Sequence, residues 1–190
     1  MARTEIGLPT DGRFIVNVGR EVAQKGQVHL MRVVARLREE HPDLHLVICG
    51  RPGESSDELT RLTADYSMEN NVTRLGYTEH VHHVVAHATL FAFPSLMEGL
   101  GTALLEAMAI GTPIVGFDIP PVRAAIGNDG ATLVALGDED GFRRECHRLL
   151  IDEPARVRQI EAGRHRVVAE YSIDVVATRV EELLRSTAAK

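Results

Sequence analysis

The stretch FAFPSLMEGLGTALLEAMAIGTPIV, residues 91–115, joins a short apolar strand, a glycine-rich turn, a helix and a second apolar strand. The first strand, Leu90–Phe93, is predicted to end at Pro94, because proline cannot donate a hydrogen bond to a central ladder. Strong helix formers follow from residue 103 to residue 109. This succession predicts a strand–helix–strand unit, from which parallel sheets are built.

The helix in this stretch is predicted to have an apolar face and an open face. At about 100° per residue, five residues fall on one apolar stripe, namely Leu100, Ala103, Leu104, Ala107 and Met108. Glu106 lies off that stripe, on the side of Thr102, and Glu98 lies in the turn before the helix. Gly99 and Gly101 would bring a ligand close to the free N–H groups of the helix N-terminus, which form a natural anion site.

Two carboxylates beside an anion site predict a ligand that has both hydroxyl and phosphate groups. The alternative is an ordinary crossover in which the glycines only permit tight packing.

Composition excludes several classes of protein. Hydrophobic residues make up 44% and charged residues 25% of the 190 residues, as in soluble globular proteins. No apolar run approaches the ~20 residues of a membrane span, and the first residues lack the apolar region of a secretory signal. Cys49 and Cys146 are expected to be reduced thiols in a cytoplasmic protein. The net charge of −6 argues against nucleic-acid binding.

The whole chain alternates between strand and helix patterns. Strands are predicted at Phe14–Val18, Leu44–Cys49, Val72–Leu75, Leu90–Phe93, Pro113–Phe117 and Thr132–Leu136. Helices are predicted at Gln27–Glu40, Ser55–Met68, His80–Ala88, Gly101–Ile110, Val122–Ile126, Glu139–Ile151, Pro154–Glu170 and Ile173–Thr187. Short apolar strands between helices indicate an α/β domain, doubly wound around a mostly parallel six-stranded sheet.

The residues after the strands are unusual for their position. In open parallel sheets, ligands bind outside the carboxyl ends of the strands. That crevice would be lined by Gly19, Arg20, Gly50, Gly76, Ser95 and the turn that contains Glu98. Arg20 and Lys25, in the turn after the first strand, are suited to bind phosphate. The turn lacks the residue order of a Walker A loop. The chain contains no GxGxxG motif, which argues against an enzyme that binds a nicotinamide or flavin dinucleotide. The alternative is that both cations are solvated turn residues.

Together these segments resemble one family, the retaining glycosyltransferases of the glycosyl transferases group 1 type. The resemblance is to the C-terminal, donor-binding half of their GT-B fold, which is Rossmann-like. It rests on EIGLPTDGRFIVNVGREVAQKG (5–26), LHLVICGRPG (44–53), NVTRLGYT (71–78), FAFPSLMEGLGTALLEAMAIGTPIVGFD (91–118) and EYSIDVVATRVEELL (170–184). The segment 91–118 is similar to the signature segment of the family, which includes a glutamate, seven residues and a second glutamate, here Glu98 and Glu106.

The resemblance implies a role for each site residue. Arg20 and Lys25 would bind the diphosphate of a nucleotide-sugar and stabilise the departing nucleotide. Glu106 would bind the ribose and Glu98 the hydroxyls of the donor sugar, so that Arg20, Lys25 and Glu98 are the candidate catalytic residues. The remaining candidate donor-binding residues are Gly19, Arg51, Gly76, Tyr77, Ser95, Gly99, Leu100, Gly101 and Thr102. The nucleobase would lie against the loops that contain Arg51 and Tyr77.

The family's reaction transfers the sugar with retained configuration and without a metal ion or other cofactor. Front-face attack with leaving-group assistance is its usual proposal, so Glu98 is not expected to be a covalent nucleophile. The histidines of EHVHHVVAH, residues 79–87, lack an acidic or cysteine ligand at the spacing of a metal site. No metal site is therefore predicted.

The sequence departs from the family in one residue and in its length. Leu100 stands where the family often has phenylalanine, and both are apolar. The first strand starts at about residue 14, which leaves no room for an N-terminal acceptor-binding lobe. We therefore expect one donor-binding domain, residues 1–190, with residues 172–190 forming a helix that would cross to the absent lobe. The exposed face would be apolar and suited to homodimer formation.

Without that lobe, donor binding is expected with little or no transfer activity. Two alternatives stay open. The chain could be a non-catalytic module that binds nucleotide-sugars, or half of a nucleotide-sugar epimerase on the same fold.

Overall fold

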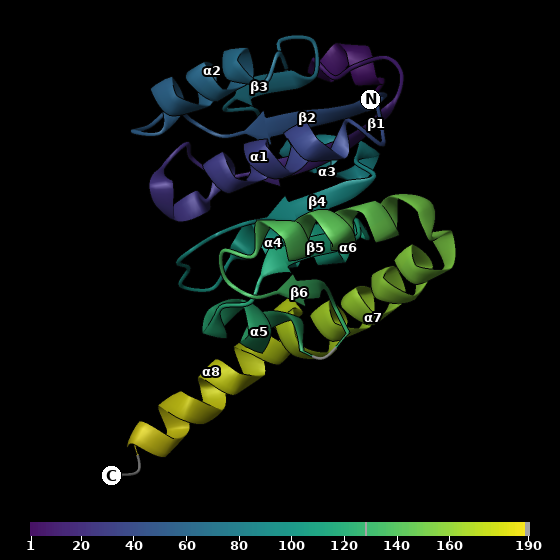
Figure 1. The fold of residues 1–190 in the computed structure, drawn as a ribbon. Helices are drawn as coiled ribbons and strands as arrows, with labels where there is room; N and C mark the ends of the chain where they lie inside the picture. The colour runs from purple at the N-terminus through teal and green to yellow at the C-terminus, as the bar shows by residue number, and fades with distance from the viewer. Residues whose placement is uncertain (128, 189–190) are drawn as a thin grey trace.

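The computed structural model describes residues 1–127 and 129–188 and contains one six-stranded sheet between two layers of helices (Figure 1). Every strand pair is parallel, and the order is β3-β2-β1-β4-β5-β6. The strands are β1 Arg13–Val18, β2 Leu44–Cys49, β3 Val72–Gly76, β4 Leu90–Phe93, β5 Ile114–Phe117 and β6 Thr132–Val134. The predicted six-stranded α/β sheet is confirmed, and it is parallel throughout.

The helices alternate with the strands along the chain. They are α1 Gln27–Leu37, α2 Ser56–Asp65, α3 Val81–His87, α4 Thr102–Ile110, α5 Pro120–Ile126, α6 Glu139–Ile151, α7 Glu153–Tyr171 and α8 Ile173–Ala188. Two short 3₁₀ helices, η1 Arg3–Ile6 and η2 Ala23–Lys25, precede β1 and α1. No helix within the described ranges has the length and apolar content that crossing a membrane requires.

Burial on both faces explains why the strands are apolar at nearly every position. The strand residues on the same face of the sheet as Ile15 pack against α1, α2 and α6. Phe14 and Val16 lie on the other face and pack against α3, α4 and α5. Helix α7 packs against α4 and α6, and the amide of its Gln159 bonds both the N–H and the C=O of Ile114 at the start of β5. Helix α8 then extends away from the body of the domain (Figure 1).

The strand order reverses between β1 and β4, and this reversal creates a crevice at their carboxyl ends. Asn17 on β1 joins the two strands there, since its Nδ2 donates to the carbonyl oxygen of Ala92 at 3.0 Å. The loops that follow the two strands are packed together. Gly26 has φ +65°, and an added Cβ would overlap the carbonyl oxygen of Pro94. The sequence needs glycine here because no side chain fits.

Several predicted boundaries differ from the structure by one to three residues, and three details matter most here. Helix α1 ends at Leu37 rather than Glu40, because the N–H groups of Glu39 and Glu40 bond to carbonyl oxygens three residues earlier, in a tighter turn than an α-helix makes. Strand β6 ends at Val134 rather than Leu136, because a turn closed by Gly137 at φ +80° follows it. Leu100 does not belong to the apolar stripe of α4. It precedes the helix and is 50% exposed, whereas Leu104 of that stripe is fully buried.

Candidate functional site

Two adjoining cavities open at the carboxyl ends of the central strands. The first, which we call the polar cleft, has a volume of about 450 Å³ and is lined by Val18, Gly19, Arg20, Lys25, Phe93, Glu98, Leu100, Gly101, Thr102 and Ala103. The second, which we call the apolar slot, has a volume of about 170 Å³ and is lined by Val18, Gly19, Arg20, Cys49, Gly50, Gly76, Tyr77, Thr78 and Val81. The two cavities share residues 18–20, so Arg20 stands where they meet.

The polar cleft holds an ion pair between two predicted site residues. Lys25 Nζ lies 2.6 Å from Glu98 Oε1, and the two side chains are 22% and 9% exposed. The hydroxyl of Ser95 donates to the same carboxylate oxygen at 2.8 Å. The basic turn after β1 and the acidic turn after β4 therefore meet across the crevice, because β4 pairs with β1.

The N-terminus of α4 opens into the polar cleft. Gly101 precedes the helix with φ +74°, and Gly101, Thr102 and Ala103 all line the cleft. No side chain caps this end, and its first turn has no acidic residue. By contrast, Asp138 caps α6 and Asp152 caps α7. The first N–H groups of α4 are thus available to an anion in the cleft.

The apolar slot lies between the loops that follow β1, β2 and β3. One of its lining glycines, Gly50, is required by close backbone approach, since an added Cβ there would overlap the carbonyl oxygen of Gly19. At the rim, the guanidinium carbon of Arg51 lies 5.1 Å from the centroid of the Tyr77 ring, in cation–π contact. Tyr77 is 67% exposed and presents a planar aromatic surface beside the slot.

Four of the predicted site residues do not line either cavity. Ser95, Gly99, Arg51 and Glu106 are not among the described lining residues of the polar cleft or the apolar slot. Glu106 lies one turn beyond Thr102 on α4, and its Oε2 is 3.5 Å from Nε2 of His82 on α3. The only hydrogen bond of the Ser95 hydroxyl found among the described residues goes to Glu98. The donor-binding roles of these four residues, and those of the predicted residues that do line the cavities, stay predictions.

Several lining residues were missed from the sequence. Val18, Phe93, Ala103, Cys49, Thr78 and Val81 line the two cavities but are chemically ordinary. Their position next to strand ends was the one available signal. Gln27 was also missed, although it is buried and its Nε2 donates to the carbonyl oxygens of Gly19 and Arg20 at 3.1 Å each. These bonds fix the loop after β1. Burial raises the pKa of Cys49 to about 12, so this thiol stays protonated.

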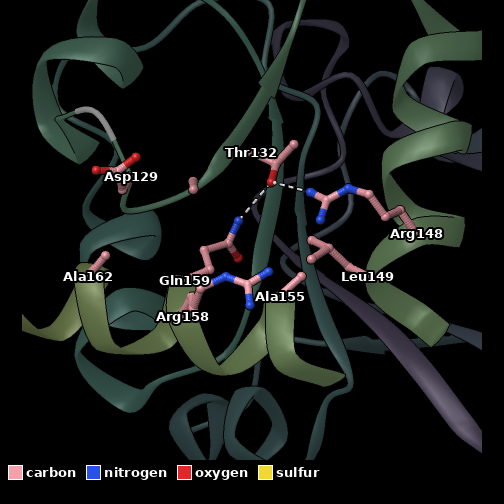
Figure 2. Close-up of a pocket in the computed structure, with 9 residues that line it drawn as sticks. Asp129, Thr132, Arg148, Leu149, Ala155, Arg158, Gln159 and Ala162 are labelled. Carbon is pink, nitrogen blue, oxygen red and sulfur yellow. Dashed lines mark hydrogen bonds between the residues drawn. The ribbon is translucent and has the colours of Figure 1, made fainter. Parts of the chain in front are cut away.

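A third cavity, of about 430 Å³, lies away from this site (Figure 2). Thr132, the first residue of β6, and Arg148 near the end of α6 lie at its wall, with Arg158 and Gln159 of α7 (Figure 2). Because β6 begins here, this cavity is at the amino end of the parallel sheet, opposite the polar cleft. The Gln159 amide donates to Thr132 and binds the backbone of β5, which indicates a structural role. Among the described residues, no group of three acidic, histidine or cysteine side chains is placed to hold a metal ion.

Comparison with known proteins identifies the family. A model described as glycosyl transferases group 1 matches residues 2–166. The chain belongs to this family. Lipopolysaccharide core biosynthesis glycosyltransferase LpsE of Rhizobium meliloti (strain 1021) is 30% identical over 186 residues, which cover 97% of this chain and 53% of that protein. The predicted family is confirmed.

Solved structures of other proteins share the fold. Sucrose-phosphate synthase from Thermosynechococcus elongatus superposes with a TM-score of 0.86 at 24% identity, over 99% of this chain and 48% of that one. HepE of Anabaena, crystallised in complex with UDP, gives a TM-score of 0.86 at 18% identity, over 93% of this chain and 50% of that one. The chain spans about half the length of these relatives, consistent with the predicted C-terminal domain of a group 1 glycosyltransferase.

Proposed function

We propose that this chain binds the nucleotide-diphosphate sugar of a retaining glycosyltransferase across the polar cleft and the apolar slot. One observation supports this most directly. The two cavities meet at Arg20, with an uncapped helix end and the Lys25–Glu98 pair on the polar side. A nucleotide-sugar has the same order of parts, with a flat base, a diphosphate and a hydroxyl-rich sugar.

In this assignment the diphosphate lies between Arg20, Lys25 and the N-terminus of α4. During transfer, the bond from the anomeric carbon to the diphosphate oxygen breaks, a bond to the oxygen of an acceptor hydroxyl forms, and the proton of that hydroxyl passes to the departing diphosphate. Negative charge then builds up on the departing diphosphate, and the two cations and the helix end stabilise it. These groups supply positive charge without a metal ion, so we expect nucleotide binding to be unchanged by a chelator.

Glu98 is assigned to the sugar hydroxyls and not to covalent catalysis. Its Oε1 accepts hydrogen bonds from both Lys25 and Ser95, and these bonds reduce the electron density that a nucleophile needs. They also hold the carboxylate in one orientation, as a group that positions a sugar requires. This arrangement supports retention through front-face attack, assisted by the leaving group.

The base is assigned to the apolar slot, where Tyr77 and Arg51 provide a stacking surface at the rim. Ribose would lie between the slot and α4, within reach of Glu106. Because HepE was crystallised with UDP, UDP is the first nucleotide to test.

Transfer itself is assigned to a longer assembly. Helix α8 exposes Ile173, Val180, Leu183 and Leu184 to between 50% and 78%, on a helix that extends from the domain (Figure 1). We infer that this apolar face binds an N-terminal acceptor lobe, and that a homodimer forms through it when the lobe is absent. Light scattering of the chain, with Leu183→Glu as the disrupting variant, tests the dimer. The free, buried thiols Cys49 and Cys146 support a cytoplasmic location.

Calorimetric titration with UDP, GDP and ADP tests the donor site. Arg20→Ala and Glu106→Ala should each weaken the best nucleotide by about 1.5–3 kcal/mol, or ten- to a hundredfold in Kd. Arg61→Ala is the matched control, because this arginine is 67% exposed on α2 and pairs only with Glu58 among the described residues. Absence of binding at millimolar nucleotide would refute the proposal.

Activity tests separate the transferase from a binding module. If an N-terminal lobe joined to this chain yields glycoside with the donor's anomeric configuration, measured by proton coupling in NMR, the retaining assignment holds. Inverted product would contradict it. Nucleotide binding without any transfer in the joined protein would favour a non-catalytic module.

A further inference from the structure

A buried carboxylate lies directly behind the polar cleft. Glu21 follows Arg20 in the loop after β1, yet it is only 2% exposed. Within the described residues, no other acidic residue is buried to this extent. A carboxylate in this environment is costly unless it is paired and hydrogen-bonded. Glu21 must therefore have partners that offset the cost of its burial.

The partners of Glu21 form a closed network. Arg74 binds both carboxylate oxygens, with Nε donating to Oε1 at 2.8 Å and Nη2 donating to Oε2. The hydroxyl of Ser56 donates to Oε2 at 2.5 Å and accepts from the N–H of Gly53 at 2.9 Å. Arg74 also donates from Nη1 to the hydroxyl of Thr60 at 2.8 Å. Such a two-pronged contact fixes orientation as well as neutralising charge.

This network joins three segments of the chain. Glu21 belongs to the loop after β1, Ser56 starts α2, and Arg74 lies on the edge strand β3. The backbone of Glu21 adds two bonds to the loop after β2, accepting from Ser55 and donating to the carbonyl oxygen of Arg51, both at 3.0 Å. The two loops that contain the cleft and slot arginines, Arg20 and Arg51, are thus tied to each other through residue 21.

We propose that Glu21 and Arg74 are positioning residues of the diphosphate site. Their ion pair holds the loops of Arg20 and Arg51 in the arrangement that receives a diphosphate, and Arg74 cancels a negative charge that would otherwise repel it. The inference rests on the proposed function. Neither residue touches the ligand, since neither is among the described residues that line the polar cleft or the apolar slot.

The test measures binding of UDP and of inorganic diphosphate by calorimetry, at a temperature where every variant is folded. Arg74→Met should weaken both ligands about tenfold, because it leaves an unpaired carboxylate beside the site. Glu21→Gln in the Arg74→Met background should recover part of that loss, because it removes the unpaired charge. Uridine, which lacks phosphate, should lose less affinity in the variants than UDP does, because Arg51 serves the base whereas Arg20 serves the diphosphate. A general loss of structure would weaken uridine and UDP together.

The pair of Arg13 and Asp43 provides a matched control. Arg13 starts β1, and its Nε and Nη2 donate to the Asp43 carboxylate at 2.9 and 2.6 Å, at the opposite end of the sheet. Arg13→Met should lower the melting temperature without changing diphosphate affinity. If Arg74→Met fails to fold, Glu21→Gln alone, which is equal in size, should weaken diphosphate about threefold.

The outcomes distinguish this inference from the proposed function. Wild-type affinity in both Arg74→Met and Glu21→Gln, or an equal loss in Arg13→Met, would overturn the positioning role and leave the donor site standing. A wild-type chain that binds neither inorganic diphosphate nor any of UDP, GDP and ADP would overturn both.

Discussion

Replacing Glu98 with glutamine separates the charge of the cleft carboxylate from its shape. In the structure Lys25 Nζ lies 2.6 Å from Glu98 Oε1, in a pair that is mostly shielded from water. Lys25 therefore has to serve both Glu98 and a bound diphosphate, and the carboxylate itself repels the phosphates. A nucleoside diphosphate that lacks the sugar gains nothing from Glu98. We expect such a ligand to bind Glu98→Gln more tightly than it binds the wild type.

The size of the effect follows from the charges. At about 7 Å and an effective dielectric constant of about 20, two unit charges interact by about 2 kcal/mol. Screening over a Debye length of about 8 Å leaves roughly 1 kcal/mol, or about fivefold in Kd. Glutamine also replaces a charge-assisted hydrogen bond with a neutral one, so the free energy of unfolding should fall by about 1 kcal/mol. The melting temperature should then drop by about 3 °C.

The assay is calorimetric titration with whichever of UDP, GDP and ADP the wild type binds best, at low and at high salt. The gain should shrink as salt rises, because its origin is electrostatic. Asp43→Asn is the control, since it removes a paired carboxylate at the far end of the sheet and should leave affinity unchanged. Equal or weaker nucleotide binding by a folded Glu98→Gln would refute the competition for Lys25.

Three further predictions follow from burial and backbone geometry. Burial alone would raise the pKa of Glu21, but hydrogen bonds from Arg74 and a serine hydroxyl outweigh it and hold this pKa below its ordinary value of 4.5. Because the pKa is lower in the folded than in the unfolded state, ionised Glu21 stabilises the protein above pH 4.5, and this stabilisation is lost as pH falls through the folded pKa. In urea titrations, the free energy of unfolding should therefore fall less steeply with decreasing pH in Glu21→Gln than in the wild type. Burial raises the pKa of Cys49 to about 12, so iodoacetamide at pH 8 should label this thiol only after unfolding, and rapid labelling of native protein would contradict its burial. Gly26→Ala and Gly76→Ala both place alanine at positive φ, but only at Gly26 would the added Cβ also overlap backbone atoms. Thermal unfolding should show that the free energy of unfolding falls by about 1 kcal/mol in Gly76→Ala and by at least about 3 kcal/mol in Gly26→Ala. Similar decreases in the two variants would count against the close packing of the loops.

Local pattern was sufficient to predict which strand ends lie beside the two cavities of the candidate site. Apolar runs that stop at Gly19, Gly50, Gly76 and Pro94 mark strand boundaries, and the parallel arrangement brings all of these ends to one edge. The boundaries that failed, such as the end of α1, depend on how a turn is closed after the periodic pattern has stopped. Such closure involves a few backbone hydrogen bonds that side-chain periodicity does not encode.

Tertiary structure alone decided which site residues are bonded to one another. Lys25 and Glu98 are separated by 73 positions, and they meet because β4 returns to lie beside β1. Leu100, which helical spacing placed in the core, is exposed because the helix begins only at Thr102. Glu21 shows the difference most clearly. A glutamate in a polar turn is expected to face solvent, and this one can be buried only because Arg74 of β3 pairs with it. The sequence by itself determined the strands, the helices and the residue types at the crevice, because these depend on residues that are near in the chain. The pairing of site residues and the burial of their side chains depend on contacts between distant segments, and the order of strands in the sheet determines those contacts.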